Sequence, residues 1–443
     1  MEQIFKGNNT FDKKTEDMVT NWTKTYFNTP PTDIIPPFTE NDIDKNIKNL
    51  KNNKAPGNDK ITNIILKNLD KKISKILHII YSACYKLCYF PNRWKEGEIT
   101  MIYKRKGSSL DPSNYRPITL LSQLGKIFES TLEIEIRSFA ESNNLIDNNQ
   151  SGFRKNGSTM DNLYIVTQKI KEAFNRKRQV DGIFIDFEKC FDKVWKEGVL
   201  YKMYKLGFNK HLIHLMRSFL FNKKNYIKIN GTLSDIFETL AGLPQGSILS
   251  PILFIIFISD LPLDPSITTS KFADDIAILY ELKNKKSKID KTNKKMQNYL
   301  NKINTYCKKW KLKINISKTK KISFGHITIT TTQYMIDNTP LENVKEIKFL
   351  GLYLDENLNF NYHTTKIISK ASCTIPLLLN MNNTKFPINI NTKRKIFLSS
   401  TRSILEYGHV ALITNNVKKL QKNRNIPKKM SKNNHTKKLD NTK

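Results

Sequence analysis

Residues 271–280, Lys-Phe-Ala-Asp-Asp-Ile-Ala-Ile-Leu-Tyr, place two adjacent carboxylates between two apolar runs. Both flanks carry β-branched or aromatic residues, which are typical of strands, so we expect a strand, a tight turn and a second strand. Asp274 and Asp275 then lie at the turn, which can direct both side chains towards one ion. Two anions placed so close together are costly unless a cation neutralises them. An isolated Asp-Asp pair is more often a solvated turn than an ion-binding one, so the interpretation depends on other motifs in the chain.

The composition favours a folded protein with a polyanionic partner. The chain has 443 residues, 39% of them hydrophobic, and a net charge of +34. Nucleic acid is the natural partner for such a charge, because Lys and Arg contacts to phosphate dominate its binding. No apolar run approaches the roughly 20 residues of a membrane-spanning helix, so we expect no membrane contact. The five scattered cysteines form no zinc set, and reduced thiols in an intracellular compartment fit them best.

Hydrophobic spacing predicts a mixture of helices and strands. Thr39 is expected to cap one helix, and Ser250 is expected to cap another, with Pro251 in its first turn. Helices are predicted at residues 12–26, 39–50, 61–89 with a break, 125–144, 160–176, 199–206, 210–220, 252–258 and 283–310. Strands are predicted at residues 99–103, from 183, around the Asn-Gly turn at 230–231, at 321–324 and at 347–355.

A third carboxylate, Asp186, follows a buried strand beginning at residue 183. Transfer of a nucleotide to a polynucleotide needs two divalent ions roughly 3.5–4 Å apart, held by a few carboxylates. Mg²⁺ prefers oxygen ligands and keeps some of its waters, so three carboxylates suffice. Lys104, Lys106 and Arg116 could neutralise a triphosphate, although a basic turn such as residues 104–107 is more often simply solvated.

Six short stretches occur in an order and at spacings that match one enzyme family. They are Asn-Tyr-Arg-Pro-Ile at 114–118, Gln-Ser-Gly-Phe-Arg at 150–154, Phe-Ile-Asp-Phe-Glu-Lys-Cys-Phe-Asp-Lys-Val at 184–194, Gly-Leu-Pro-Gln-Gly-Ser at 242–247, Phe-Ala-Asp-Asp at 272–275 and Phe-Leu-Gly at 349–351. With these motifs, residues 98–355 resemble the reverse transcriptase of a non-LTR (LINE-type) retrotransposon. The resemblance extends more weakly to residues 54–57 and 405–408.

This resemblance implies an α+β right-hand polymerase of fingers, palm and thumb, with an antiparallel palm sheet that carries the catalytic aspartates. It divides the chain into an N-terminal extension leading into the fingers (1–84), a reverse transcriptase domain of fingers and palm (85–353) and a partial thumb (354–416). Residues 417–443 hold ten Lys or Arg and one Asp, and we expect a disordered basic tail there. Residues 349–351 resemble the primer-grip strand of the family.

Carried over residue by residue, the resemblance makes Asp186, Asp274 and Asp275 the catalytic carboxylates and metal ligands. They would hold two Mg²⁺ ions, with Mn²⁺ as an alternative. The neighbouring Asp192 matches a structural position of the family.

Four further residues match substrate-binding positions of the family. Arg116 corresponds to the finger arginine that binds the triphosphate, and Gln245 to the residue beside the incoming nucleotide and template. Phe191 corresponds to the aromatic side chain that packs beneath the sugar and excludes a 2′-hydroxyl. Lys318 is the candidate proton donor to pyrophosphate, with Lys320 as the alternative.

The implied function is RNA-directed DNA polymerase activity, with an RNA template, a DNA primer and deoxynucleoside triphosphates as partners and a nuclear location. Two alternatives stay open: an inactive nucleic-acid-binding relic of such an element, and a maturase-like RNA-binding protein. The residues before the polymerase region are too few for the family's usual nuclease, so we expect an element-encoded nuclease supplied elsewhere. Cys190 stands where the family usually has Ala, a small change that should be tolerated.

Overall fold

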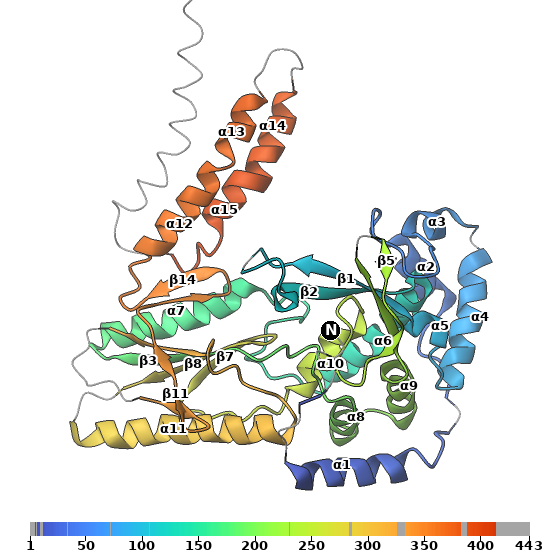
Figure 1. The fold of residues 1–443 in the computed structure, drawn as a ribbon, viewed down its shortest axis with the longest axis horizontal. Coiled ribbons are helices and arrows are strands. Elements are labelled where there is room, and N and C mark those ends of the chain that lie inside the picture. Colours follow the sequence, from blue (N-terminus) through green and yellow to red (C-terminus); the bar gives the residue numbers. More distant parts are fainter. Residues whose placement is uncertain are drawn as a thin grey trace, which may run out of the picture.

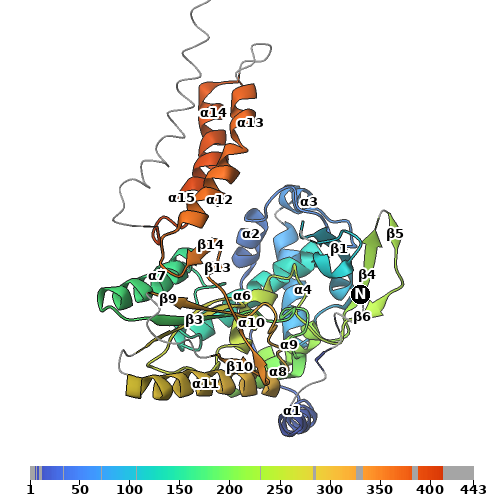
Figure 2. The same ribbon diagram turned by 60° about the vertical axis from the view of Figure 1, so that its left-hand side comes forward.

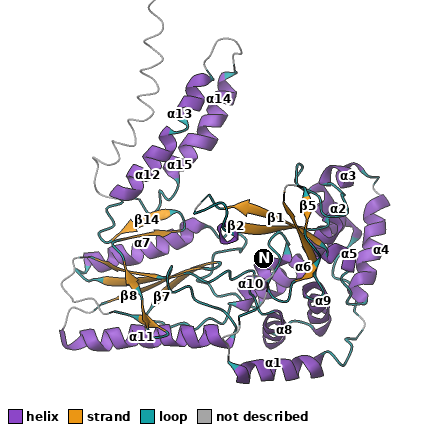
Figure 3. Cartoon of the chain, viewed as in Figure 1, coloured by secondary structure: helices purple, strands orange, loops and turns teal. Residues whose placement is uncertain are grey.

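The computed structural model combines a body of helices and sheets with a helical projection (Figures 1 and 3). It describes residues 5, 7–8, 12–32, 34–70, 72–105, 107–229, 231–282, 286–325, 333–381 and 388–412. The basic tail predicted at 417–443 lies outside the described residues. Mixed helices with mainly antiparallel strand pairs confirm the α+β class. Among the described residues, no helix combines the length and the apolar character that crossing a membrane requires.

Helices precede the first strand, as predicted. Asp12 accepts a hydrogen bond from the Thr15 amide and so caps the first helix, and Thr39 forms a capping box with Asp42 at the start of the second. The predicted break in residues 61–89 separates two helices. These helices are α1 Lys13–Tyr26, α2 Glu40–Lys48, α3 Asn63–Asn68, α4 Lys72–Lys86 and α5 Asn92–Lys95.

A five-stranded sheet has the strand order β12-β9-β3-β8-β7. Its strands are β3 Val180–Ile185, β7 Thr268–Phe272, β8 Asp275–Glu281, β9 Lys320–Phe324 and β12 Glu342–Asn343. The β9–β3, β3–β8 and β8–β7 pairs are antiparallel, and β12 joins β9 in parallel. Strand β3 therefore lies in the centre, between β8 and β9.

Both faces of this sheet are covered, and the alternation along β8 shows how. Ile276, Ile278 and Tyr280 belong to one hydrophobic core, whereas the intervening Ala277 and Leu279 belong to another. Successive side chains of a strand point to opposite faces, so each core occupies one face. Helix α7 (Thr159–Asn175) covers one face and α11 (Lys286–Lys309) lies on the other, above and below the sheet in Figure 1.

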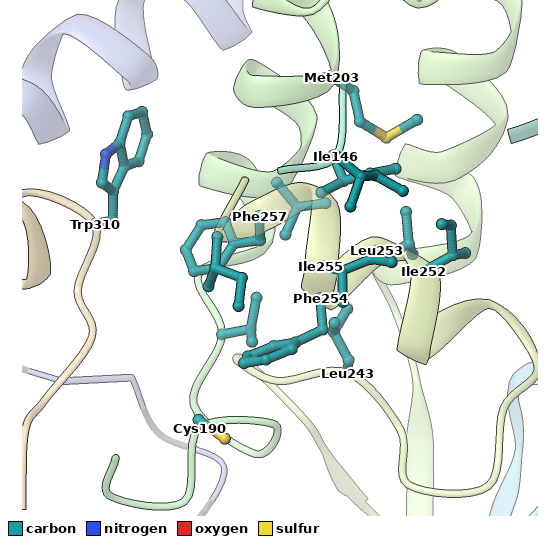
Figure 4. Packing of buried hydrophobic residues seen from close by; sticks show 14 of the residues in the cluster. Ile146, Cys190, Met203, Leu243, Ile252, Leu253, Phe254, Ile255, Phe257 and Trp310 are labelled. Carbon is teal, nitrogen blue, oxygen red and sulfur yellow. The ribbon is translucent and has the colours of Figure 1, made fainter. Parts of the chain in front are cut away.

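The larger core surrounds α10 (Leu249–Phe257), whose side chains are almost all buried. Figure 4 shows Ile252, Leu253 and Phe257 pointing from this helix into its neighbours, with Cys190 beyond one end of the cluster. Helices α6 Gln123–Ser142 and α8 Lys196–Lys205 pack directly on α10, and α9 Lys210–Leu220, which packs on α8, adds side chains to the same core.

The start of α10 corrects one prediction. The helix begins at Leu249, and Ser250 does not cap it, because its hydroxyl donates to the carbonyl of Pro244 at 2.9 Å. The buried carboxylate of Glu129 instead accepts from the hydroxyl of Ser247 at 2.6 Å and the amide of Ile248 at 2.7 Å. A capping group more than a hundred residues away in sequence cannot be recognised from the local pattern.

A second sheet has the strand order β2-β1-β4-β5, with β6 paired to β4. The predicted turn at 230–231 connects β4 to β5, although Asn230 lies outside the described residues. The strands of this second sheet are β1 Gly97–Tyr103, β2 Tyr115–Leu120, β4 Lys224–Ile229, β5 Thr232–Leu233 and β6 Phe237–Glu238. A short helix, η2 Pro112–Asn114, precedes β2.

The predicted single strand at residues 347–355 is in fact a hairpin. Strands β13 (Glu346–Phe349) and β14 (Leu352–Asp355) pair antiparallel, and the Phe-Leu-Gly motif forms their turn. Leu350 and Gly351 both have positive φ, 44° and 84°, as a two-residue hairpin turn of this kind requires. Gly351 satisfies this requirement without strain, and the strand pattern alone did not reveal the reversal.

Beyond this hairpin, helices project away from the body in both views (Figures 1 and 2). They are α12 Asn361–Ser372, α13 Ile375–Asn380, α14 Ile390–Ile396, the π-helix η3 Phe397–Arg402 and α15 Ser403–Glu406. The Tyr407 hydroxyl donates to the carbonyl of Leu350 at 2.5 Å, so the end of the projection is fastened to the hairpin turn. A smaller hairpin, β10 (Met335–Ile336) and β11 (Thr339–Pro340), packs on α11.

The core contains buried lysines, of which Lys223 is the most perturbed. Its side chain is buried, with the ammonium 3.9 Å from the centroid of the Phe219 ring. Burial lowers the pKa of Lys223 from 10.5 to about 7, and the carboxylate of Glu129 opposes this shift. Between pH 7 and 10.5 the unfolded chain binds a proton that the folded chain has released, so this residue makes stability rise with pH.

We therefore expect Lys223→Met to stabilise the protein by about 1–4 kcal/mol at pH 6, the range seen when well-packed apolar residues replace buried charges. The gain should shrink towards pH 10, where the lysine is neutral in the folded state and loses its proton in the unfolded state as well. Denaturant unfolding at pH 6 and pH 9.5 measures the difference. An equal gain in unfolding free energy at both pH values would contradict a lowered pKa for buried Lys223.

Candidate active site

The two adjacent aspartates lie at a hairpin turn, as the sequence predicts. Phe272 at the end of β7 pairs with Asp275 at the start of β8, which leaves Ala273 and Asp274 as the two turn residues. Ala273 has a φ of +55°, in the left-handed region that residues with a side chain seldom adopt. The carboxylates are thus presented at the tip of a tight turn.

Strand pairing brings Asp186 to the same place. Ile185 at the end of β3 pairs with Ile276 of β8, so the next residue, Asp186, is the neighbour of Asp275. Adjacent strands lie about 5 Å apart. The structure therefore brings Asp186 next to the adjacent pair Asp274 and Asp275, although at least 88 residues separate it from them in the sequence.

The electrostatics of the three carboxylates reflect this proximity. Burial raises the pKa of Asp186, the ammonium of Lys318 opposes this, and the charge of Asp274 adds to it. Partial desolvation, followed by repulsion from Asp274 and Asp186, raises the pKa of Asp275 to about 6, although part of this side chain remains accessible to solvent. A cation between them would relieve this repulsion.

The segment before β9 holds the backbone of Asp186. The amide of Asn315 donates to the Asp186 carbonyl at 2.8 Å, and the Asp186 amide donates to the Thr319 hydroxyl at 3.2 Å. Lys318 is exposed in the same segment and acts electrostatically on Asp186. Lys320 is engaged elsewhere, in an ion pair with Glu342. Of the two lysines, Lys318 is the one whose charge lowers the pKa of Asp186.

Lys104 and Lys318 act electrostatically on Asp186, and we call these two lysines together with Arg116 and Lys189 the basic rim. Desolvation and then the charges of the other three members lower the pKa of Lys104, so each of the three lies near enough to repel its ammonium. Arg116 is exposed on β2, where it pairs with Ile102 of β1. Lys106, predicted with Lys104, lies outside the described residues.

Phe191 and Gln245 are brought together by backbone hydrogen bonds. The amide of Leu243 donates to the Phe191 carbonyl at 2.7 Å, which ties the Gly-Leu-Pro-Gln-Gly-Ser loop to the segment after β3. Half-buried Phe191 stacks on Phe254, with ring centroids 4.5 Å apart. The Gln245 amide donates to the buried carboxylate of Asp192 at 2.8 Å. Asp192 therefore orients Gln245, a role consistent with its predicted structural position.

Two residues near the carboxylates escaped prediction as parts of the site. Buried Cys190 donates its thiol to Asp274 at 3.3 Å, and burial raises the pKa of this thiol well above its ordinary value, so it stays a donor. Gln150 accepts a hydrogen bond from the amide of Ala273 at 2.8 Å. Gln150 begins the Gln-Ser-Gly-Phe-Arg motif, but its partner Ala273 is 123 residues away in the sequence, and no local pattern indicates that contact.

Three accessible carboxylates opposite a basic rim suit a phosphate-bearing substrate together with cations. Among the described residues, no three His, Cys, Asp or Glu side chains form a ready-made metal site. An open set still suits Mg²⁺, which is usually bound by one or two carboxylates with waters and substrate phosphates instead of an all-protein cage. The donors present are oxygens, the type that Mg²⁺ prefers.

Comparison with known proteins identifies the family. The family model described as "Reverse transcriptase (RNA-dependent DNA polymerase)" matches residues 102–354, more than half of the chain. The chain is 30% identical over 384 residues to the "Probable RNA-directed DNA polymerase from transposon BS" of Drosophila melanogaster, covering 84% of the chain and 42% of that relative. It is 29% identical over 370 residues to the "RNA-directed DNA polymerase from mobile element jockey" of the same species, covering 82% and 40%.

The chain spans about two fifths of the length of these curated relatives. Among solved structures it is similar to apo telomerase from Candida Tropicalis, with 12% identity and a TM-score of 0.43, over 80% of this chain and 61% of that one. On the family match and the two transposon relatives, the chain belongs to the reverse transcriptase (RNA-dependent DNA polymerase) family.

Proposed function

We propose that the chain is the polymerase portion of a non-LTR retrotransposon protein, which extends a DNA primer on an RNA template. The single observation that carries this is the convergence of Asp186, Asp274 and Asp275 beside a basic rim. The proposal also draws on the family match and on the names of the two relatives, which are RNA-directed DNA polymerases of mobile elements. Primer extension on an RNA template with deoxynucleoside triphosphates is the direct test.

The three aspartates would hold two divalent ions, Mg²⁺ or Mn²⁺. Their oxygen donors fit such ions, and their mutual repulsion is the cost that bound cations remove. When bound, the ions supply charge neutralisation and polarise the reacting phosphoryl oxygens. The carboxylates themselves fix where positive charge accumulates, at the rigid end of a sheet that is buried on both faces.

The basic rim would receive the triphosphate of the incoming nucleotide. Arg116 and Lys104 on the β1–β2 hairpin neutralise its negative oxygens, and exposed Lys318 donates a proton to the departing pyrophosphate. Lys318 is favoured over Lys320 for this role, because Lys320 is paired with Glu342 whereas Lys318 acts on Asp186. Gln245, oriented by Asp192, is positioned to contact the nucleotide or template.

In this proposal the five-stranded sheet with α7 and α11 is the palm, and the β1–β2 sheet with the N-terminal helices forms the fingers. The β13–β14 hairpin is the primer grip, and the projecting helices α12 to α15 are the thumb. The hydrogen bond from Tyr407 to Leu350 then joins the thumb to the primer grip. Thumb position and primer position would be coupled through this contact.

The rate of primer extension tests whether the three carboxylates hold the catalytic ions. Asp186→Asn, Asp274→Asn and Asp275→Asn should each lower kcat for primer extension by about 10³-fold, because several kcal/mol of charge stabilisation depends on the ions that they hold. A double variant should be little worse than a single one, since the ligands act as one unit.

The matched control is Asp337→Asn, which changes an exposed carboxylate in another hairpin turn, between β10 and β11. It should retain parental activity. Full activity in Asp274→Asn would remove the metal-holding role. A parent chain that folds but never extends a primer would favour the inactive relic.

Sugar selection tests Phe191. Phe191→Val should raise the incorporation of ribonucleotides relative to deoxynucleotides, because the half-buried ring would no longer block a 2′-hydroxyl. The ratio of kcat/KM for the two nucleotide types measures this. Unchanged discrimination in a folded variant would refute the assignment, whereas loss of folding would mark Phe191 as a core residue that supports Phe254.

Salt dependence tests the nucleic-acid partner. With a net charge of +34, affinity for an RNA–DNA hybrid should fall by about 10³-fold or more between 50 and 200 mM salt, as it does for proteins that make six to ten phosphate contacts. Fluorescence anisotropy titrations at several salt concentrations give the slope. Affinity that hardly changes with salt would contradict phosphate-dominated binding.

A further inference from the structure

The Gln-Ser-Gly-Phe-Arg motif packs against the turn that carries two of the three carboxylates. Gln150 is 3% exposed, and its side-chain oxygen accepts from the amides of Ala273 at 2.8 Å and Gly152 at 2.9 Å. Its side-chain nitrogen lies 3.4 Å from the Ala273 carbonyl, to which it donates. Both backbone groups of the left-handed turn residue are therefore paired with one side chain.

The rest of the motif fixes the loop that supplies Gln150. The backbone runs beside β7, with hydrogen bonds from the Lys271 amide to the Asn149 carbonyl at 2.9 Å and from the Ser151 amide to the Lys271 carbonyl at 3.0 Å. Arg154 pairs with Glu141 on α6 through two hydrogen bonds. The loop is thus anchored independently of the turn that it contacts.

Gly152 allows the loop to approach the turn this closely. A Cβ at position 152 would lie 2.2 Å from the Ala273 nitrogen and 2.8 Å from the Phe272 carbonyl carbon, both backbone atoms. Any side chain there would push the turn directly. Two residues of the motif therefore meet the same turn, one by hydrogen bonding and one by its lack of a side chain.

We propose that Gln150 is a positioning residue, which holds the Ala273 turn so that Asp274 and Asp275 face Asp186. This rests on the proposed polymerase function for its catalytic consequence but not for its structural one. Gln150 touches no reacting atom. It keeps a backbone that would otherwise avoid a left-handed conformation in the one geometry that presents both carboxylates.

Two variants test the proposal from different sides. Gln150→Met keeps the approximate size of the side chain but leaves the Ala273 amide without its partner, and Gly152→Ala displaces the turn sterically. Each should lower kcat for primer extension by about 10- to 100-fold, since misplacing a catalytic group by 1 Å can cost about a hundredfold. The KM for primer–template should change little, because the basic surface is untouched.

The matched control is Gln179→Met. Gln179 is equally buried, at 3% exposed, and donates to Asp181 at 3.4 Å near the opposite end of β3. This variant should lose stability without a change in kcat. A purely structural role for Gln150 predicts that the two glutamine variants lose kcat and stability in the same proportion.

Hydrogen exchange measured by mass spectrometry gives a readout that does not need activity. In Gln150→Met, amides of residues 272–276 should exchange about tenfold faster, the effect of losing roughly one net hydrogen bond, while peptides of β9 stay unchanged. Unaltered exchange at the turn, or a kcat within twofold of the parent, would overturn the proposal. A parent chain without polymerase activity would refute the proposed function alone, and the exchange result would still decide the role of Gln150.

Discussion

The pairing of β3 with β8 is the constraint on which the site depends. It places Asp186 beside Asp275 at the end of a sheet that is covered on both faces, so the carboxylates cannot move apart without disturbing two hydrophobic cores. The cost appears as raised pKa values at Asp186 and Asp275. Lys318 and Lys104 of the basic rim oppose part of the pKa rise at Asp186, and this combination of fixed anions with exposed cations suits a site that binds phosphate.

Around this pairing, contacts distant in sequence hold each part of the site. The segment before β9 fixes the backbone of Asp186, and the loop bearing Gln150 packs on the turn of Asp274. Cys190 donates to Asp274 from the segment after β3. Each contact is made by backbone or by a buried side chain. The carboxylates are therefore preorganised, while the cations of the rim are exposed to solvent.

Long-range contacts also hold the helical core together, where buried polar side chains connect one helix to another. Lys202 donates to the carbonyl of Phe257 at 2.5 Å and to the hydroxyl of Tyr306 at 2.6 Å, which links α8, α10 and α11. Glu129 caps α10 from α6. Such groups are costly to bury and costly to leave unpaired, so they favour one arrangement of the helices over alternatives.

By itself the sequence determined the α+β class, most helices and the Asp-Asp turn, because these follow from periodicity, caps and turn residues that act over a few positions. The ordered motifs indicated the family and the three carboxylates. Only the tertiary structure decided that residues 346–355 reverse at Leu350 and Gly351, and that Glu129 instead of Ser250 caps α10. It alone showed that the charge of Lys318 lowers the pKa of Asp186 while Lys320 pairs with Glu342, and that Gln150 accepts a hydrogen bond from the turn. These facts depend on contacts between segments far apart in the chain, and no local pattern records which distant group will satisfy a buried amide or charge.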